Sequence, residues 1–301
     1  MIVVTTPTGQ IGRQVLDRLL DVPDAAAGIR VIAREPARLP TRVREQVEVV
    51  QGSHADPGVL GKACTGADRL FWLVPPTPSA DSVEGHFHAF TESLREVTSR
   101  QGVERVVGVS TLGRSVAKNA GQISASLAMD ERIAAMGVHY RALCPPFLME
   151  NLLGQAESIR TGGVFFLAAA PDRVLRTCAT RDIAATAARL LLDDSWTGQD
   201  DVQLAGPDDL TPEGMARVVS EVLDREVRFQ AVSSAQFKET LLSRGVSAAW
   251  AQGLADMADA LSEQGFYGAD QPSTPDTAPT GFGQWCEDVL RPAVMAPGSQ
   301  G

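Results

Sequence analysis

A turn near the start of the chain has the residue types that bind phosphate. A β-branched run at residues 2–5 leads into the sequence TPTGQIG, and a helix-like segment follows at residues 13–20. A strand that turns through glycines into a helix presents backbone N–H groups and the positive end of the helix dipole to an anion. Gly9 allows close approach of a pyrophosphate, and Gly12 allows the helix to pack on the strand. The turn predicts a dinucleotide site with the candidate residues Thr6, Thr8, Gly9, Gln10, Ile11 and Gly12.

Thr6 departs from the usual pattern of three glycines, because it stands where the first glycine begins the tight turn. An ordinary strand-to-helix turn with incidental glycines is therefore the alternative interpretation. The residues that follow the later strands must decide between the two.

Arg34 follows the second expected strand, where an acidic residue would bind the ribose hydroxyls of NAD. A guanidinium at this place would instead bind a 2′-phosphate with two parallel hydrogen bonds. The residue type therefore favours NADP(H) over NAD(H), with Arg13 and Arg38 as candidate second cations. The alternative is a solvated loop arginine beside Glu35.

Composition excludes several classes of partner. The 301 residues suffice for one large α/β domain or for a main domain with a smaller companion. A formal net charge of −10 argues against nucleic acid and anionic membranes as partners. An anionic cofactor must then be held by local basic groups.

The cysteines and the hydropathy indicate a reducing compartment. Four cysteines lie far apart, without C-x-x-C spacing or clustered histidines, so we expect reduced structural thiols and no metal site. No apolar stretch is long enough to cross a membrane, and the N-terminus lacks a cleavable signal pattern. We therefore expect a cytoplasmic protein.

The first half of the chain alternates strands with helices. Apolar runs typical of strands recur between helical segments, and this alternation predicts a parallel sheet covered on both faces. The fold class is therefore α/β, a Rossmann-type doubly wound parallel sheet. The expected strands are residues 2–5, 29–33, 47–51, 69–74, 106–110 and 140–144.

Beyond Pro145 and Pro146 the pattern changes to a smaller α+β region. We expect a hairpin-like stretch at residues 164–175, short strands at 202–204 and 227–232, and a helix that begins with Thr211 as its N-cap before Pro212. The predicted domains are an NAD(P)-binding domain at residues 1–150, a substrate-binding region at 151–295, whose strands could interleave with the first, and a flexible tail at 296–301.

The carboxyl ends of parallel strands carry the ligand in open α/β sheets, at the switch in strand order. Ser110 stands at such an end, after the fifth strand, and is the candidate for orienting a substrate oxygen. A helix cap or a loop hydroxyl is an equally good interpretation of this serine.

The chain resembles the NmrA-like branch of the atypical short-chain dehydrogenase/reductases. The segments that carry the resemblance are the first turn, VIAREP at residues 31–36, VGVST at 107–111, GVHYRALCPPFLMEN at 137–151 and RDIA at 181–184. Their order and spacing are more specific than any single segment.

This resemblance implies a Rossmann-type domain and a small C-terminal domain over the nicotinamide. It implies an adenine neighbourhood with Ser53 and His54 and a nicotinamide neighbourhood with Val74, Pro75, Ser110, Pro145 and Phe147. Ser53 departs from the family pattern, in which an aspartate is usual.

The proton donor of ordinary short-chain dehydrogenases is missing. Those enzymes use a Tyr-x-x-x-Lys pair, whereas Cys144 and Gln271 stand four residues after the chain's two tyrosines, Tyr140 and Tyr267. Tyr140 lies within an expected strand and is interpreted as buried packing.

The combined expectation is an NADPH-dependent reductase of a ketone or quinone group on a hydrophobic, aromatic, polyketide-like molecule, as in secondary metabolism. The cofactor would supply the hydride, and the protein would supply its position. A non-catalytic NADP(H)-binding regulatory protein is the alternative, and a non-redox isomerase or cyclase ranks last. The sequence carries no signal for an oligomeric state.

Overall fold

The computed structural model describes residues 1–22, 28–268 and 272–296, which fall into two compact units. Both units are discontinuous in sequence. The first consists of Met1–Thr111, Ala125–Cys144 and Ile183–Val202, and the second of Leu112–Ser124, Pro145–Asp182 and Gln203–Gly301.

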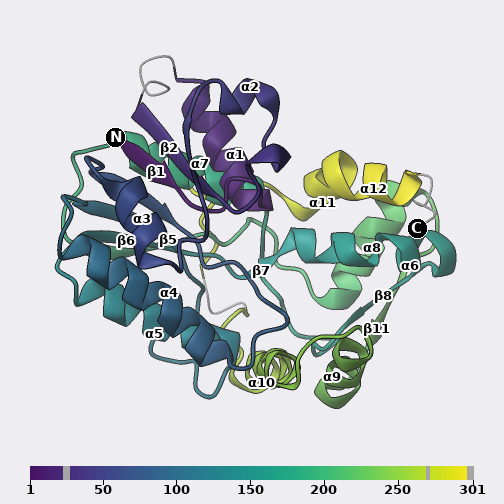
Figure 1. Cartoon of the computed structure of the whole chain (residues 1–301). Helices are drawn as coiled ribbons and strands as arrows, with labels where there is room; N and C mark the ends of the chain where they lie inside the picture. The colour runs from purple at the N-terminus through teal and green to yellow at the C-terminus, as the bar shows by residue number, and fades with distance from the viewer. Residues whose placement is uncertain (23–27, 269–271, 297–301) are drawn as a thin grey trace. The chain divides into compact units, whose positions relative to one another are not determined.

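A seven-stranded sheet with the order β10-β6-β5-β4-β1-β2-β3 forms the first unit (Figure 1). The pairs β1–β2, β1–β4, β2–β3, β4–β5 and β5–β6 are parallel. The strand order reverses between β1 and β4, which confirms the expected Rossmann-type doubly wound sheet. The strands are Ile2–Val4 (β1), Ile29–Ala33 (β2), Glu48–Gln51 (β3), Arg69–Trp72 (β4), Arg105–Val109 (β5), His139–Cys144 (β6) and Gln199–Gln203 (β10).

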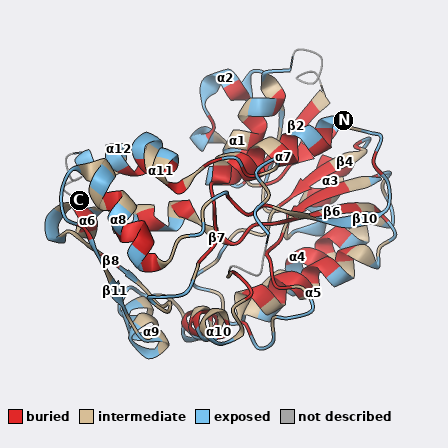
Figure 2. Ribbon diagram, turned by 180° about the vertical axis from the view of Figure 1, so that it is seen from behind, coloured by how far each residue is buried: buried red, intermediate tan, exposed pale blue. Residues whose placement is uncertain are grey.

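Helices cover both faces of this sheet, as its apolar strands require. Every residue of β1 and β2 is buried, and Figure 2 shows the sheet interior in red. Figure 1 shows α1 (Gln10–Leu20) and α7 (Thr180–Leu192) on one face and α4 (Val83–Thr98) and α5 (Gln122–Ala134) on the other. α3 (Pro57–Cys64) packs against α4, and α2 (Thr41–Arg44) is a single turn.

The second unit contains two small parallel sheets. β8 (Val164–Leu167) pairs with β11 (Arg228–Ala231), and β7 (Phe147–Leu148) pairs with β9 (Thr177–Cys178). The expected hairpin at residues 164–175 is therefore wrong, because the partner of β8 lies far along the chain and runs parallel to it. The remaining elements are η3 (Met149–Gln155), α6 (Ala156–Gly162), α8 (Pro212–Leu223), α9 (Ser234–Ser243), α10 (Ala248–Gln264), α11 (Phe282–Trp285), η4 (Cys286–Leu290) and α12 (Arg291–Met295).

Polar caps define where the long helices of this unit begin. Thr211 is the N-cap of α8 and precedes Pro212, as the sequence predicts. Its hydroxyl accepts a hydrogen bond from the Gly214 amide. Ser233 and Gln236 form a capping box at α9, and Ser247 caps α10. Residues 297–301 of the expected tail lie outside the described residues, and so does Gln271, which stands four residues after Tyr267.

Candidate functional site

One edge of the first unit's sheet gathers most of the predicted site residues. The turn at residues 6–12 follows β1, Arg34 follows β2, and Ser110 follows β5. Because these strands and their neighbours run parallel, their carboxyl ends meet at the same edge. The other expected residues at this edge are Ser53 and His54 after β3 and Val74 and Pro75 after β4.

Thr6 adopts the backbone conformation that the missing glycine would supply. Its φ of 51° is left-handed, which a β-branched residue rarely adopts. The Thr6 Oγ1 is also buried without a hydrogen-bond partner among the described residues. A buried hydroxyl left unpaired costs about 1–3 kcal/mol, so a ligand atom that bonds with Oγ1 would remove a penalty.

Gly12 and Gly9 play different parts in the same turn. A Cβ at Gly12 would lie 2.2 Å from the Thr6 carbonyl oxygen, so only glycine fits where α1 crosses the turn. A Cβ at Gly9 would lie 3.4 Å from that oxygen, close to ordinary contact. The packing of α1 on the turn therefore requires glycine at position 12, whereas packing alone does not require it at position 9.

The N-terminus of α1 suits a diphosphate. The helix begins at Gln10, earlier than expected, and its N-cap Gly9 offers no side-chain hydrogen bond. No acidic residue stands in the first turn. The first N–H groups of the helix and its positive dipole end are thus left for an anion, and with the Thr6 hydroxyl they fit the pyrophosphate of a dinucleotide.

Arg34 is exposed and has no ion-pair partner within the described ranges of the chain. Its neighbour Glu35 pairs with Arg38 at 3.8 Å instead. The Arg34 guanidinium remains available to an anionic ligand, as the sequence-based preference for a 2′-phosphate requires.

Two histidines hold the segment that follows β4. His54 Nε2–H donates to the Leu73 carbonyl at 2.9 Å, and His86 Nε2–H donates to the Pro75 carbonyl at 2.8 Å. The ring of Phe90 lies 4.6 Å from the His54 ring and 4.9 Å from the His86 ring, by centroids. These contacts fix the backbone around Val74 and Pro75, a role that sequence reasoning did not find for either histidine.

Burial keeps His54 neutral. Desolvation of the ring lowers the pKa of His54 to about 4, with a smaller lowering from the nearby Arg34 guanidinium, while the bond to Leu73 opposes the shift. His54 therefore acts as a neutral donor to a backbone carbonyl, and the expected adenine contact of this residue stays a prediction.

Ser110 belongs to a buried network that the sequence did not predict. Its hydroxyl donates to one carboxylate oxygen of Asp130 on α5. The Tyr140 hydroxyl on β6 donates to the other oxygen at 2.7 Å. Tyr140 is 3% exposed, so its interpretation as buried packing is confirmed, and Asp130 is the additional member.

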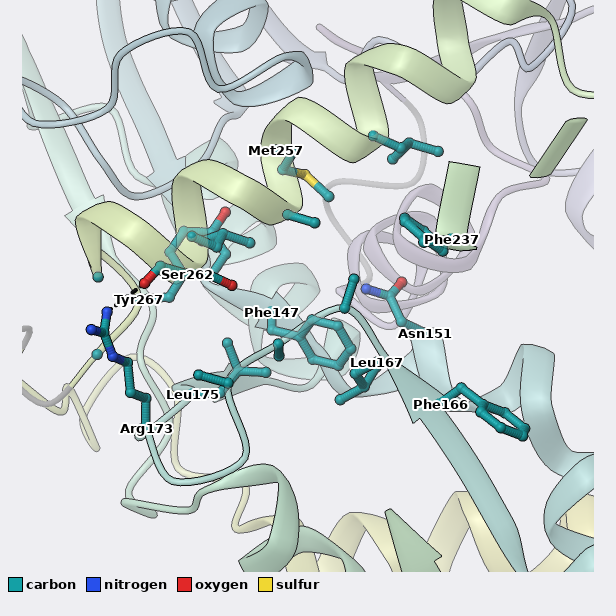
Figure 3. Close-up of a pocket in the computed structure, with 18 of the residues that line it drawn as sticks. Phe147, Asn151, Phe166, Leu167, Arg173, Leu175, Phe237, Met257, Ser262 and Tyr267 are labelled. Atoms are coloured by element: carbon teal, nitrogen blue, oxygen red, sulfur yellow. Dashed lines mark hydrogen bonds between the residues drawn. The ribbon is translucent and has the colours of Figure 1, made fainter. Parts of the chain in front are cut away.

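A cavity of about 600 Å³ lies within the second unit (Figure 3). Its walls come from β7, η3, β8 and the loop that follows β8, and from α9, α10 and the turn after α10. Most of the lining residues are apolar. Phe147, one of the predicted nicotinamide neighbours, and Met257 face the cavity, whereas Met149, Trp250 and Phe266 belong to the core. The aromatic lining residues are Phe147, Phe166, Phe237 and Tyr267.

Few polar groups face this cavity. The Gln155 amide is engaged with both backbone groups of Phe166, at 2.8 Å each. Among the described lining residues Arg173 alone is charged, and it donates to the Ser262 carbonyl, as the dashed line in Figure 3 shows. Asn151 points its amide toward the cavity, so a bound molecule would meet apolar walls with a few donors.

The remaining predictions concern thiols and metals. Cys64, Cys144, Cys178 and Cys286 are buried thiols that form no disulfide, and burial raises the pKa of Cys64 and Cys286 to about 12. The thiols are therefore structural. Across the described residues there is no group of side chains that could hold a metal ion, and no helix long and apolar enough to span a membrane.

Comparison with known proteins agrees with this geometry. The model of a family described as NAD(P)H-binding matches residues 7–194. A (4-alkanoyl-5-oxo-2,5-dihydrofuran-3-yl)methyl phosphate reductase of Streptomyces griseus is 29% identical over 245 residues, 81% of each chain.

Two solved structures share the fold. An NADPH-dependent quinone oxidoreductase from Escherichia coli, in complex with NADPH, has a TM-score of 0.75 at 25% identity and covers 94% of this chain and 98% of its own. A mutant NmrA has a TM-score of 0.71 at 12% identity, with 96% and 95% covered, which shows a common fold alone.

Proposed function

Since this chain belongs to the NAD(P)H-binding family, we propose that it is an NADPH-dependent reductase of a quinone or ketone group on a hydrophobic, aromatic molecule. The aromatic-lined cavity of about 600 Å³ in the second unit carries this proposal. A cavity of this size and lining is typical of small-molecule sites. A protein that only senses its cofactor would not need it.

The turn after β1 would hold the cofactor through its pyrophosphate. Backbone N–H groups of Gln10, Ile11 and Gly12 would donate to it, the Thr6 hydroxyl would gain a partner, and Thr8 would line the entrance of the turn. Arg34 would bind the 2′-phosphate and so select NADPH over NADH.

Within the first unit, Val74 and Pro75 would border the nicotinamide, and Ser53 and His54 would border the adenine. When bound, NADPH supplies a hydride. The chain's own contribution is to hold that cofactor and the acceptor in place and to exclude water from an apolar cavity.

A quinone suits a site without a tyrosine–lysine acid pair. The Tyr140 hydroxyl is committed to Asp130 and buried, so it is not a free proton donor. A reduced quinone is a phenolate of moderate basicity, which water can protonate without a strong protein acid. The names of the relatives, a quinone oxidoreductase and a reductase of an acyl-bearing unsaturated furanone phosphate, support a conjugated carbonyl compound as the substrate.

The test is anaerobic mixing of the purified protein with NADPH and a panel of quinones and aromatic ketones, followed by NADPH absorbance and product mass. We expect cofactor oxidation and a product that carries two additional hydrogens. Tight NADPH binding without oxidation by any panel member would contradict the proposal and favour the regulatory alternative. A product of unchanged mass would favour an isomerase.

Substitutions in the cavity separate its role from that of the cofactor turn. Met257→Trp would fill part of the cavity, so we expect KM for a bulky quinone to rise about tenfold or more while the Kd of NADPH stays unchanged. Met295→Trp is the matched control, because Met295 is 69% exposed and does not line the cavity.

A further inference from the structure

Asp130 is a buried carboxylate held between two hydroxyl groups. It is 1% exposed and accepts from the Ser110 Oγ–H and, at 2.7 Å, from the Tyr140 hydroxyl. Asp130 lies on α5, Ser110 directly follows β5, and Tyr140 lies on β6. A carboxylate in such a place needs hydrogen-bond donors, because its burial is otherwise costly.

The sequence around this carboxylate leaves room for the network. A Cβ at Gly108 would lie 2.5 Å from the Tyr140 hydroxyl oxygen and 2.7 Å from its ring. Only glycine at this position of β5 allows the phenol to reach across the strand toward Asp130. The network therefore depends on glycine at position 108 as well as on Ser110, Asp130 and Tyr140.

The network fixes the hydrogen-bonding character of Ser110. A serine hydroxyl has one proton and two lone pairs, and here the proton is given to Asp130. The Ser110 amide is also engaged, since it donates to the Leu143 carbonyl at 2.8 Å. What Ser110 can offer to a ligand at the end of β5 is therefore an acceptor.

We propose that Asp130 is a positioning residue that holds the Ser110 hydroxyl as a hydrogen-bond acceptor, so that the end of β5 binds a donor group and discriminates against a bare carbonyl. This inference rests on the proposed function, because the ligand would be bound NADP(H) or the reduced substrate. It also differs from the expected role of Ser110, because the serine would bind a hydrogen-bond donor and not a ketone oxygen.

Two ligands can supply such a donor. The carboxamide of nicotinamide has an N–H2 group, and a hydroquinone has an O–H group. Both are neutral donors that suit a neutral acceptor paired with a buried carboxylate. The experiment therefore has one arm for each ligand, and it determines which of the two supplies the donor to Ser110.

The first arm measures Kd for NADP+ and for its 3-acetylpyridine analogue, in which a methyl group replaces the N–H2. The second arm measures Kd for a hydroquinone and for its quinone in the presence of NADP+. We expect the wild type to prefer the donor-bearing ligand about 3- to 10-fold in one of the arms. The arm that shows the preference identifies the source.

Three variants test the role of Asp130. Ser110→Ala removes the acceptor and should abolish the preference. Asp130→Asn can donate its own N–H2 to Ser110 and so free the serine proton to point outward, which should abolish or invert the preference. Tyr140→Phe is the matched control, because it removes the Tyr140 hydrogen bond to Asp130 but keeps that of Ser110, and it should keep the preference at a lower stability.

A merely structural network would change the thermal stability of all three variants and leave both binding ratios as in the wild type. Unchanged ratios in Ser110→Ala would overturn the inference even if Asp130→Asn failed to fold. No preference of the wild type in either arm would overturn it as well. Absence of NADP+ binding by the wild type would instead overturn the proposed function.

Discussion

Gly108 on β5 lies directly beneath the phenol of Tyr140 on β6. A Cβ at position 108 would stand 2.5 Å from the Tyr140 hydroxyl oxygen, and the two residues belong to neighbouring parallel strands that pair Gly108 with Ala142. The missing side chain of one residue thus provides the space for the other. Through that space Tyr140 reaches Asp130.

Gly108→Ala should therefore destabilise the protein. The added methyl group must displace the Tyr140 ring and weaken its bond to Asp130, at a cost of about 1–3 kcal/mol in the free energy of unfolding. Chemical denaturation measures the change. Gly102→Ala is the matched control, because nothing lies within 4 Å of a Cβ there, and a loss of equal size in both variants would contradict the explanation.

The two glycines of the first turn should separate folding from binding. Gly12→Ala places a Cβ 2.2 Å from the Thr6 carbonyl oxygen, so we expect both lower stability and loss of NADPH binding. Gly9→Ala adds only a near-contact of 3.4 Å, so we expect nearly normal stability with NADPH bound about tenfold more weakly. Denaturation and calorimetric titration of both variants check this, and normal NADPH affinity in Gly9→Ala would count against the turn as a pyrophosphate site.

Arg34→Ala should weaken NADPH binding much more than NADH binding. A charge-assisted bond to the 2′-phosphate contributes about 1.5–3 kcal/mol, which is a factor of roughly 10 to 100 in Kd. Arg38→Ala is the matched control, since Arg38 pairs with Glu35 at 3.8 Å, and we expect less than about a threefold change there. Equal losses for both cofactors in Arg34→Ala would disprove the assignment.

The sheet could be predicted from the sequence because each of its strands is marked by a local run of apolar residues. Parallel strands covered on both faces need apolar runs, and β1 and β2 are buried throughout. The pairing of β8 could not be predicted in this way. Its partner β11 is distant in sequence, and the local pattern of β8 does not distinguish a hairpin from a parallel pair.

The sequence predicts the candidate site where backbone and strand ends determine it, as at Gly12 and Arg34. It does not reveal Asp130, because a single aspartate in a helix has no motif. A signal does exist, since Leu127, Asp130 and Ile133 recur at helical spacing and place a carboxylate on the buried stripe of α5. A charged residue on an apolar stripe needs partners, and these are contributed by strands that the helix covers.

The buried His54 should make the stability of the first unit depend on pH in a defined window. Its pKa is about 4 in the folded protein, against 6.5 for a solvated histidine, so the unfolded chain binds the extra proton between these values. The free energy of unfolding is therefore unaffected by His54 above pH 6.5 and decreases as the pH falls toward 4. The decrease is at most about 3 kcal/mol. Denaturation at a series of pH values measures this slope.

His54→Gln should lower stability at neutral pH and flatten the slope between pH 6.5 and 4, because an amide can still donate to the Leu73 carbonyl but takes up no proton. The exposed His88 provides the control, since His88→Gln removes a histidine that contacts Arg132 and leaves the ring contacts of Phe90 with His54 and His86 intact. The difference between the two variants isolates His54 from the carboxyl groups that titrate in the same range. If His54→Gln kept the wild-type slope, the His54 ring would have to be hydrated in the folded protein, and the segment at Val74 and Pro75 would lack rigid support from this side.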